Sequence, residues 1–126
     1  MEKKELTNIP GMEADNKVII WKMNYGFKSD LQGETNKFSV EQDGKKASGK
    51  AVMDLKKMKI FSLVFGIFES AELKITSPKD LGLGLGEEEK DARVRVIRNL
   101  EPEIGDYLFK EITALNKEPS EELKKN

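Results

Sequence analysis

The chain contains no cysteine and no histidine among its 126 residues. Disulfide bonds, thiolate nucleophiles and zinc sites built from thiolate or imidazole ligands are therefore excluded, as are catalytic triads that use histidine as the base. Carboxylates, lysines, hydroxyls and tyrosines remain for acid and base chemistry, and no arrangement of them marks a catalytic site. We therefore expect a protein that is not an enzyme and that uses no cofactor or metal.

An excess of charge of one sign is also missing. The 22 basic and 23 acidic side chains give a formal net charge of −1, which argues against a basic nucleic-acid coat or an acidic tail as a description of the whole chain. Residues 1–16 contain no apolar stretch, so we expect no signal peptide or membrane anchor there. The longest apolar-rich run, residues 60–68, is about half the length that spans a bilayer. The expected protein is soluble and cytoplasmic.

The length fits one domain. Pro10, Gly11 and mixed charges predict a flexible N-terminal arm over residues 1–16. A single α+β domain is expected over residues 17–116, followed by a charged, frayed tail over residues 117–126.

Alternating apolar and polar residues predict an antiparallel sheet, because successive side chains of a strand point to opposite faces. The Asp43-Gly44 pair is a strong hairpin signal, since glycine accepts a positive φ. The predicted strands span residues 18–27, 38–46 and 71–76.

Fourfold apolar spacing predicts helices packed on one face of that sheet, as in an open-faced sandwich. One helix is expected from Lys50, with Ser48 as its cap. Another is expected from Glu87, where acidic residues suit a helix N-terminus, and a third from Pro102. The apolar stripe expected on the third helix consists of Ile104, Leu108, Ile112 and Leu115.

The apolar run of residues 60–68 has two interpretations, because periodicity does not separate buried helix from buried strand in so short a run. As core, which we favour, it closes the sheet. As an exposed extension of the helix from Lys50, it forms an apolar patch of the kind that marks partner surfaces. We hypothesise that at least one of Phe61, Val64, Phe65 and Phe68 contacts a protein partner or a second copy of the chain.

Three segments resemble a known family. In residues 43–55 a predicted hairpin ends in Gly49-Lys50 and leads into a helix, and residues 65–67 (Phe-Gly-Ile) precede a predicted strand. Residues 24–27 end in a Gly-Phe pair. The order of these elements is similar to that of the histidine-containing phosphocarrier protein family of the bacterial sugar phosphotransferase system. The resemblance implies an open-faced α+β sandwich.

The departures from that family concern its phosphorylation sites. When Gly26-Phe27 is aligned with the Gly-Leu pair before the family's active histidine, Lys28 replaces the histidine and Asp30 replaces the assisting arginine. Ala51 stands where some members have a regulatory serine. The resemblance therefore implies a non-catalytic protein-binding or regulatory module. In that family partners dock around the first and second helices, so the expected partner-binding residues are Lys50, Met58, Phe61, Val64, Phe65 and Phe68.

A small nucleic-acid-binding protein is the alternative. Residues 45–59 carry six lysines and a single aspartate, a charge that suits a phosphate backbone. The same segment has no arginine and no aromatic residue, which weakens bidentate phosphate recognition and base stacking. The lysines of this cluster are Lys45, Lys46, Lys50, Lys56, Lys57 and Lys59.

The absence of histidine, together with Ala51 at the resembled serine position, leads to a first prediction. Incubation with radiolabelled phosphoenolpyruvate and the general phosphotransferase enzyme is expected to leave the protein unlabelled. An active phosphocarrier protein in the same assay is labelled. Radiolabel transfer followed by acid treatment measures this. An acid-labile phosphate on the chain would contradict the prediction.

Overall fold

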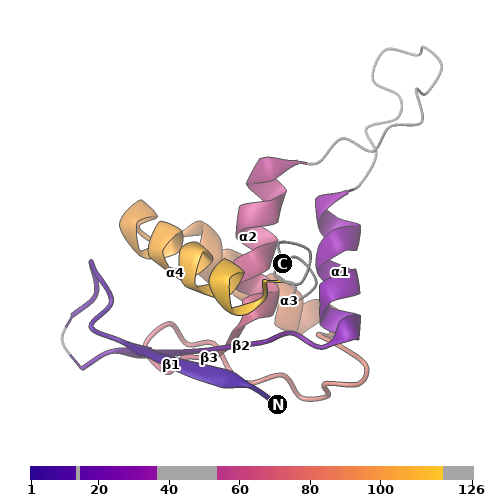
Figure 1. Ribbon diagram of the computed structural model, residues 1–126, viewed down its shortest axis with the longest axis horizontal. Coiled ribbons are helices and arrows are strands. Elements are labelled where there is room, and N and C mark those ends of the chain that lie inside the picture. Colours follow the sequence, from indigo (N-terminus) through magenta and orange to yellow (C-terminus); the bar gives the residue numbers. More distant parts are fainter. Residues whose placement is uncertain (14, 37–53, 118–126) are drawn as a thin grey trace, which may run out of the picture.

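The computed structural model describes residues 1–13, 15–36 and 54–117. These residues form a three-stranded antiparallel sheet, in the order β1-β2-β3, and four helices. In Figure 1, α1, α2 and α4 are drawn above the strands. The expected α+β class with an antiparallel sheet is confirmed. The elements are β1 (Lys3–Thr7), β2 (Lys17–Trp21), α1 (Tyr25–Thr35), α2 (Leu55–Gly66), β3 (Ile67–Glu69), α3 (Glu87–Arg98) and α4 (Pro102–Leu115).

The expected N-terminal arm is wrong, because residues 3–7 form the edge strand β1. This strand pairs with β2 in a register that places Lys3 opposite Trp21. Leu6 and Ile9 are buried, and a Cβ atom on Gly11 would lie 3.0 Å from Cγ1 of Ile104 on α4. The segment is therefore fixed by burial of two apolar side chains and by close packing of its turn on a helix.

The predicted strand over residues 18–27 is too long. β2 ends at Trp21, and Asn24 caps α1 because its Oδ1 accepts a hydrogen bond from the Phe27 amide at 2.9 Å. Phe27 is buried, whereas Tyr25 is 87% exposed. The apparent alternation thus crosses a strand end and the first turn of a helix.

The α2 helix begins later than expected. Its N-cap is Asp54, whose Oδ1 accepts hydrogen bonds from the amides of Lys56 and Lys57, both at 3.1 Å. The predicted start at Lys50 is therefore wrong. The predicted strand 38–46, the Asp43-Gly44 hairpin and the Ser48 cap lie outside the described residues.

Residues 60–68 contain both structures that the sequence left open. α2 continues to Gly66, and β3 follows at once from Ile67. The strand expected over residues 71–76 is wrong: Lys74 has a φ of 58°, and one isolated bridge joins Ser70 to Ile75.

The helices expected from Glu87 and Pro102 are confirmed as α3 and α4. Ile104, Leu108 and Ile112 of the α4 stripe are buried. The remainder of the expected frayed tail, residues 118–126, lies outside the described residues.

Trp21 lies at the centre of the core and is 1% exposed. Its ring packs edge-on against Phe27, with centroids 4.9 Å apart, and against Phe68 at 5.5 Å. Its Nε1 donates a hydrogen bond to the carbonyl of Phe65 at 2.8 Å. A single side chain therefore joins the end of β2 to α1, to the end of α2 and to β3.

Arg93 of α3 is a buried cation, only 4% exposed. Its Nη1 donates to the carbonyl oxygens of Val64 and Ile67 at 2.8 and 2.5 Å, and its Nη2 donates to those of Phe68 and Thr76 at 2.9 and 2.6 Å. The guanidinium therefore satisfies three carbonyls where α2 passes into β3, and a fourth at Thr76.

Burial lowers the pKa of Arg93 to about 10, and the nearby Glu89 carboxylate opposes this effect. Arg93 is therefore charged at neutral pH in both the folded and the unfolded chain. The pKa of Arg93 in the folded chain lies below its ordinary value, so at a pH between these two values the unfolded chain binds more protons. The contribution of Arg93 to stability therefore rises with pH only in that interval. At lower pH, Arg93 adds no pH dependence to stability.

The crossing of α2 and α4 is set by Gly66. A Cβ atom at this position would lie 2.6 Å from Cγ2 of Ile112, which is itself buried. Gly66→Ala is expected to destabilise the protein by about 1–3 kcal/mol, because a packed core does not accept the methyl group without strain. Urea unfolding measures the change.

Gly33→Ala is the matched control for that substitution. Gly33 lies within α1, and a Cβ atom there would meet nothing within 4 Å. This change is expected to be neutral or to stabilise the helix by up to about 1 kcal/mol. Equal stability of the two variants would contradict the close approach of α2 and α4.

Arg93→Met is expected to destabilise the protein by several kcal/mol, since each buried carbonyl left without a donor costs about 1–3 kcal/mol. Arg95→Met, on the exposed face of the same helix, is expected to change stability by less than about 0.5 kcal/mol. Denaturant midpoints measure both effects. If the two variants unfold at the same midpoint, Arg93 does not hold the junction of α2 and β3.

Candidate protein-binding groove

A groove of about 840 Å³ lies between α1, α2 and α4. We call it the three-helix groove. Most of its described lining residues are apolar or present aliphatic stems. They are Met23, Leu31, Met58, Ser62, Phe109, Lys110, Ile112, Thr113, Ala114, Asn116 and Lys117.

The geometry of α2 opens this groove. α2 approaches α4 closely where Gly66 meets Ile112, and the two helices cross rather than run parallel in Figure 1. Met58, on the N-terminal half of α2, and Ser62 line the groove together with Phe109, Ile112 and Thr113 of α4. Leu31 of α1 lines the groove as well, because α1 packs against α2.

Asn116 closes the groove at the end of α4. Its Oδ1 accepts a hydrogen bond from the Met23 amide at 2.7 Å, and its Nδ2 donates to the carbonyls of Trp21 at 3.1 Å and Ile112 at 2.9 Å. The side-chain amide therefore joins the end of α4 to the end of β2 and to the residue Met23 that follows it. It fixes the position of the groove rather than offering a group to a ligand.

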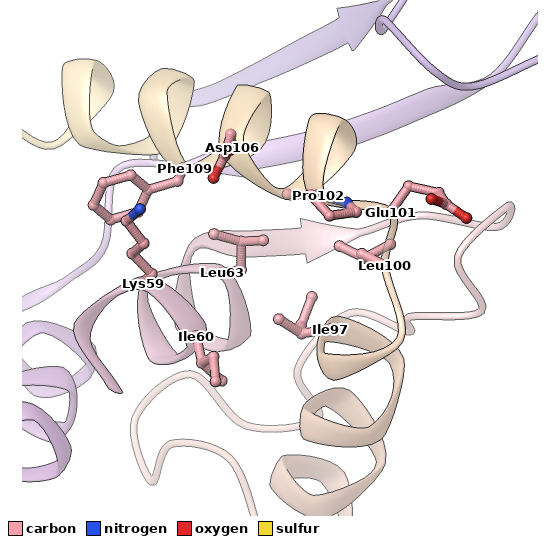
Figure 2. A pocket seen from close by; sticks show the side chains of 10 residues that line it. Lys59, Ile60, Leu63, Ile97, Leu100, Glu101, Pro102, Asp106 and Phe109 are labelled. Atoms are coloured by element: carbon pink, nitrogen blue, oxygen red, sulfur yellow. The ribbon is translucent and has the colours of Figure 1, made fainter. Parts of the chain in front are cut away.

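A second, smaller pocket of about 150 Å³ shares Phe109 with the groove. In Figure 2 the side chains of Leu63, Ile97 and Leu100 gather between α2, α3 and α4 to form its apolar part. The Lys59 ammonium lies 6.0 Å from the Phe109 ring centroid, within reach of a cation–π contact. A cavity of about this size holds a benzene-sized group, so it suits one anchoring side chain rather than a whole ligand.

The structure corrects half of the expected partner-binding set. Val64, Phe65 and Phe68 are 0%, 2% and 7% exposed, so they belong to the core and do not form a surface. The physical reason is that α2 runs directly into β3, so these residues are buried where the helix joins the sheet. The favoured core interpretation of the run holds for these three side chains.

Two of the expected residues remain near the surface. Met58 is half-buried and lines the three-helix groove. Phe61 is also half-buried and stacks on Phe65, with ring centroids 6.1 Å apart, so much of its surface is used within the chain. Lys50 lies outside the described residues.

The lysine cluster is only partly described. Lys56, Lys57 and Lys59 are exposed on the N-terminal half of α2. Lys45, Lys46 and Lys50 lie outside the described residues, so the whole cluster is not placed on one face.

Sequence reasoning missed Leu31 and Phe109 as lining residues. Leu31 stands alone in a polar segment, and Phe109 follows Leu108, the residue that belongs to the buried stripe of α4. One signal in the sequence could have indicated Phe109. It is an apolar residue next to the stripe of α4, and a wider apolar stripe can contact more than one neighbouring element.

Ionic contacts on α3 are structural. Lys90 donates to Glu34 of α1 at 3.0 Å, which raises the pKa of Lys90. The amides of Gly86 and Lys79 donate to Glu89, which lowers the pKa of Glu89. These contacts hold α3 against its neighbours and lie away from the three-helix groove.

Within the described ranges, no group of three or more acidic side chains is placed to hold a metal ion. None of the helices in these ranges has the length and hydropathy of a membrane-spanning segment. No family model, curated protein or solved structure matches the chain.

Proposed function

We propose that the protein is a non-catalytic protein-binding module and that the three-helix groove is its binding surface. The observation that carries the proposal is an apolar groove of about 840 Å³ that the described residues of three packed helices form. Burial of apolar surface is the main favourable term in most protein association. Met58, Leu31 and Phe109 are half-buried, so a partner would remove further apolar surface from water.

The sequence resemblance to the phosphocarrier family implies a function of the same kind, although the helix start at Lys50 and the strand over residues 71–76 that entered into it are wrong. Partners of that family dock around its first and second helices, and here α1 and α2 supply two walls of the groove. Under this proposal the chain keeps a docking surface without the phosphorylation sites.

Nucleic-acid binding is the alternative, and the exposed Lys56, Lys57 and Lys59 favour it. The carboxylate of Asp54 already accepts from the first free amides of α2, so this helix N-terminus does not offer those amides to a phosphate. Protein binding in the groove requires the apolar side chain of Met58, whereas nucleic-acid binding requires the charge of its neighbour Lys56.

Met58→Gln and Lys56→Gln form a matched pair on α2 that separates the two functions. Met58→Gln is expected to weaken partner capture roughly tenfold. Burial of a whole methionine side chain contributes about 1.5–3 kcal/mol, and only part of the Met58 side chain is still exposed for a partner to bury. Lys56→Gln is expected to leave capture unchanged. Affinity capture at low and high salt, with circular dichroism to check folding, measures this.

Nucleic-acid binding predicts the reverse pattern. Capture would then fall with Lys56→Gln, decline steeply with salt and disappear after nuclease treatment. That result would overturn the protein-binding proposal.

A further inference from the structure

The walls of the three-helix groove restrict the backbone conformation of what it can bind. The groove is lined by α1, α2, α4 and the residues beside them, whereas the edge strands β1 and β3 supply none of its described lining. The Asn116 side-chain amide is already engaged with three backbone groups. The Ser62 and Thr113 hydroxyls are the uncharged side-chain partners left in the described lining. Most N–H and C=O groups of an extended peptide that faced this lining would therefore meet apolar side chains such as Met58 and Leu31, which is costly.

A helix does not have this difficulty, because its backbone groups pair internally. Amphipathic helices commonly lay their apolar face into hydrophobic grooves through side chains spaced three and four residues apart. The smaller pocket beside Phe109 would accept one further anchoring side chain at the edge of such a contact.

The charged side chains among the described lining residues of the groove have one sign. Among its described lining residues the charged ones are Lys110 and Lys117, both exposed, and none is acidic. Lys56 and Lys57 are exposed on the helix that carries Met58. A partner with acidic residues beside its apolar face complements this arrangement, while a basic partner would be repelled.

We infer that the occupant of the three-helix groove is an amphipathic helix of a partner protein with acidic residues flanking its apolar face. This inference rests on the proposed protein-binding function and adds the class of partner. The helix lies with its apolar side chains against Leu31, Met58 and Phe109, and its carboxylates lie near Lys110 and Lys117.

Three synthetic peptides of roughly 18 residues, or five helical turns, test the inference. The first has leucines at helical spacing with glutamates elsewhere, the second replaces the glutamates with lysines, and the third keeps the glutamates but has proline at its centre. Fluorescence anisotropy is expected to show the acidic helix binding at least about tenfold more tightly than the other two. The preference over the lysine peptide is expected to shrink as salt rises.

Thr113 provides the matched variants, since it is exposed and lines the groove. Thr113→Glu is expected to weaken binding of the acidic peptide about tenfold or more, whereas Thr113→Lys keeps or strengthens it. Amide chemical shifts of the full chain are expected to change at Leu31, Met58 and Thr113 on addition of the acidic peptide.

Equal binding of the lysine peptide would overturn the charge assignment, and equal binding of the proline peptide would overturn the helical one. Failure of all three peptides, or shifts away from the groove, would overturn the inference as a whole. If partner capture still depends on Met58 in that case, the proposed function stands and only the occupant is wrong. If capture is also insensitive to Met58→Gln, the proposed function itself fails.

Discussion

The buried guanidinium of Arg93 is the interaction on which the arrangement of the other elements depends. α2 passes into β3 without a loop, and the last carbonyls of a helix have no donor within the helix. Buried carbonyls without donors are costly, and the two terminal nitrogens of Arg93 supply four hydrogen bonds to them and to Thr76. Arginine suits this site because its donors form a rigid planar fork. These hydrogen bonds also hold α3 against α2 and β3.

The fixed end of α2 has consequences for its other end. Gly66 brings α4 into close contact near the sheet, and Asn116 ties the end of α4 to the chain after β2. Ile112 and Asn116, which make these contacts, also line the groove, and Met58 and Phe109 stay half-buried beside them. The proposed binding surface is thus a product of the same contacts that stabilise the core.

Sequence patterns predicted the elements whose signals are local. The helices from Glu87 and Pro102 were found because the acidic first turn, the proline and the apolar stripe agree within each segment. The strand at residues 3–7 was missed because it holds a single buried side chain, Leu6, among charged ones. The predicted strand over residues 71–76 is wrong for the opposite reason, since alternating side chains there belong to a turn.

The candidate site was only partly predictable from the sequence. Met58 is the one predicted partner-binding residue that also lines the three-helix groove in the described part of the chain. Phe65 and Phe68 were equally apolar, and their role depended on whether α2 ended in solvent or entered the sheet. Leu31 gave no pattern, because its partners on α2 and α4 are distant in sequence. Burial of a side chain is decided by elements that the side chain's own segment does not encode.

The sequence by itself determined the chemistry and the class of fold. Without histidine and cysteine there is no imidazole or thiolate chemistry, and apolar periodicity of two and of about 3.6 residues yields strands and helices. Only the tertiary structure decided that Arg93 is a buried structural cation, that the aromatic end of α2 is core, and that three helices leave a groove. These features depend on contacts between distant segments, whose geometry follows from packing and from hydrogen-bond satisfaction across the whole chain, while composition and spacing act within one segment.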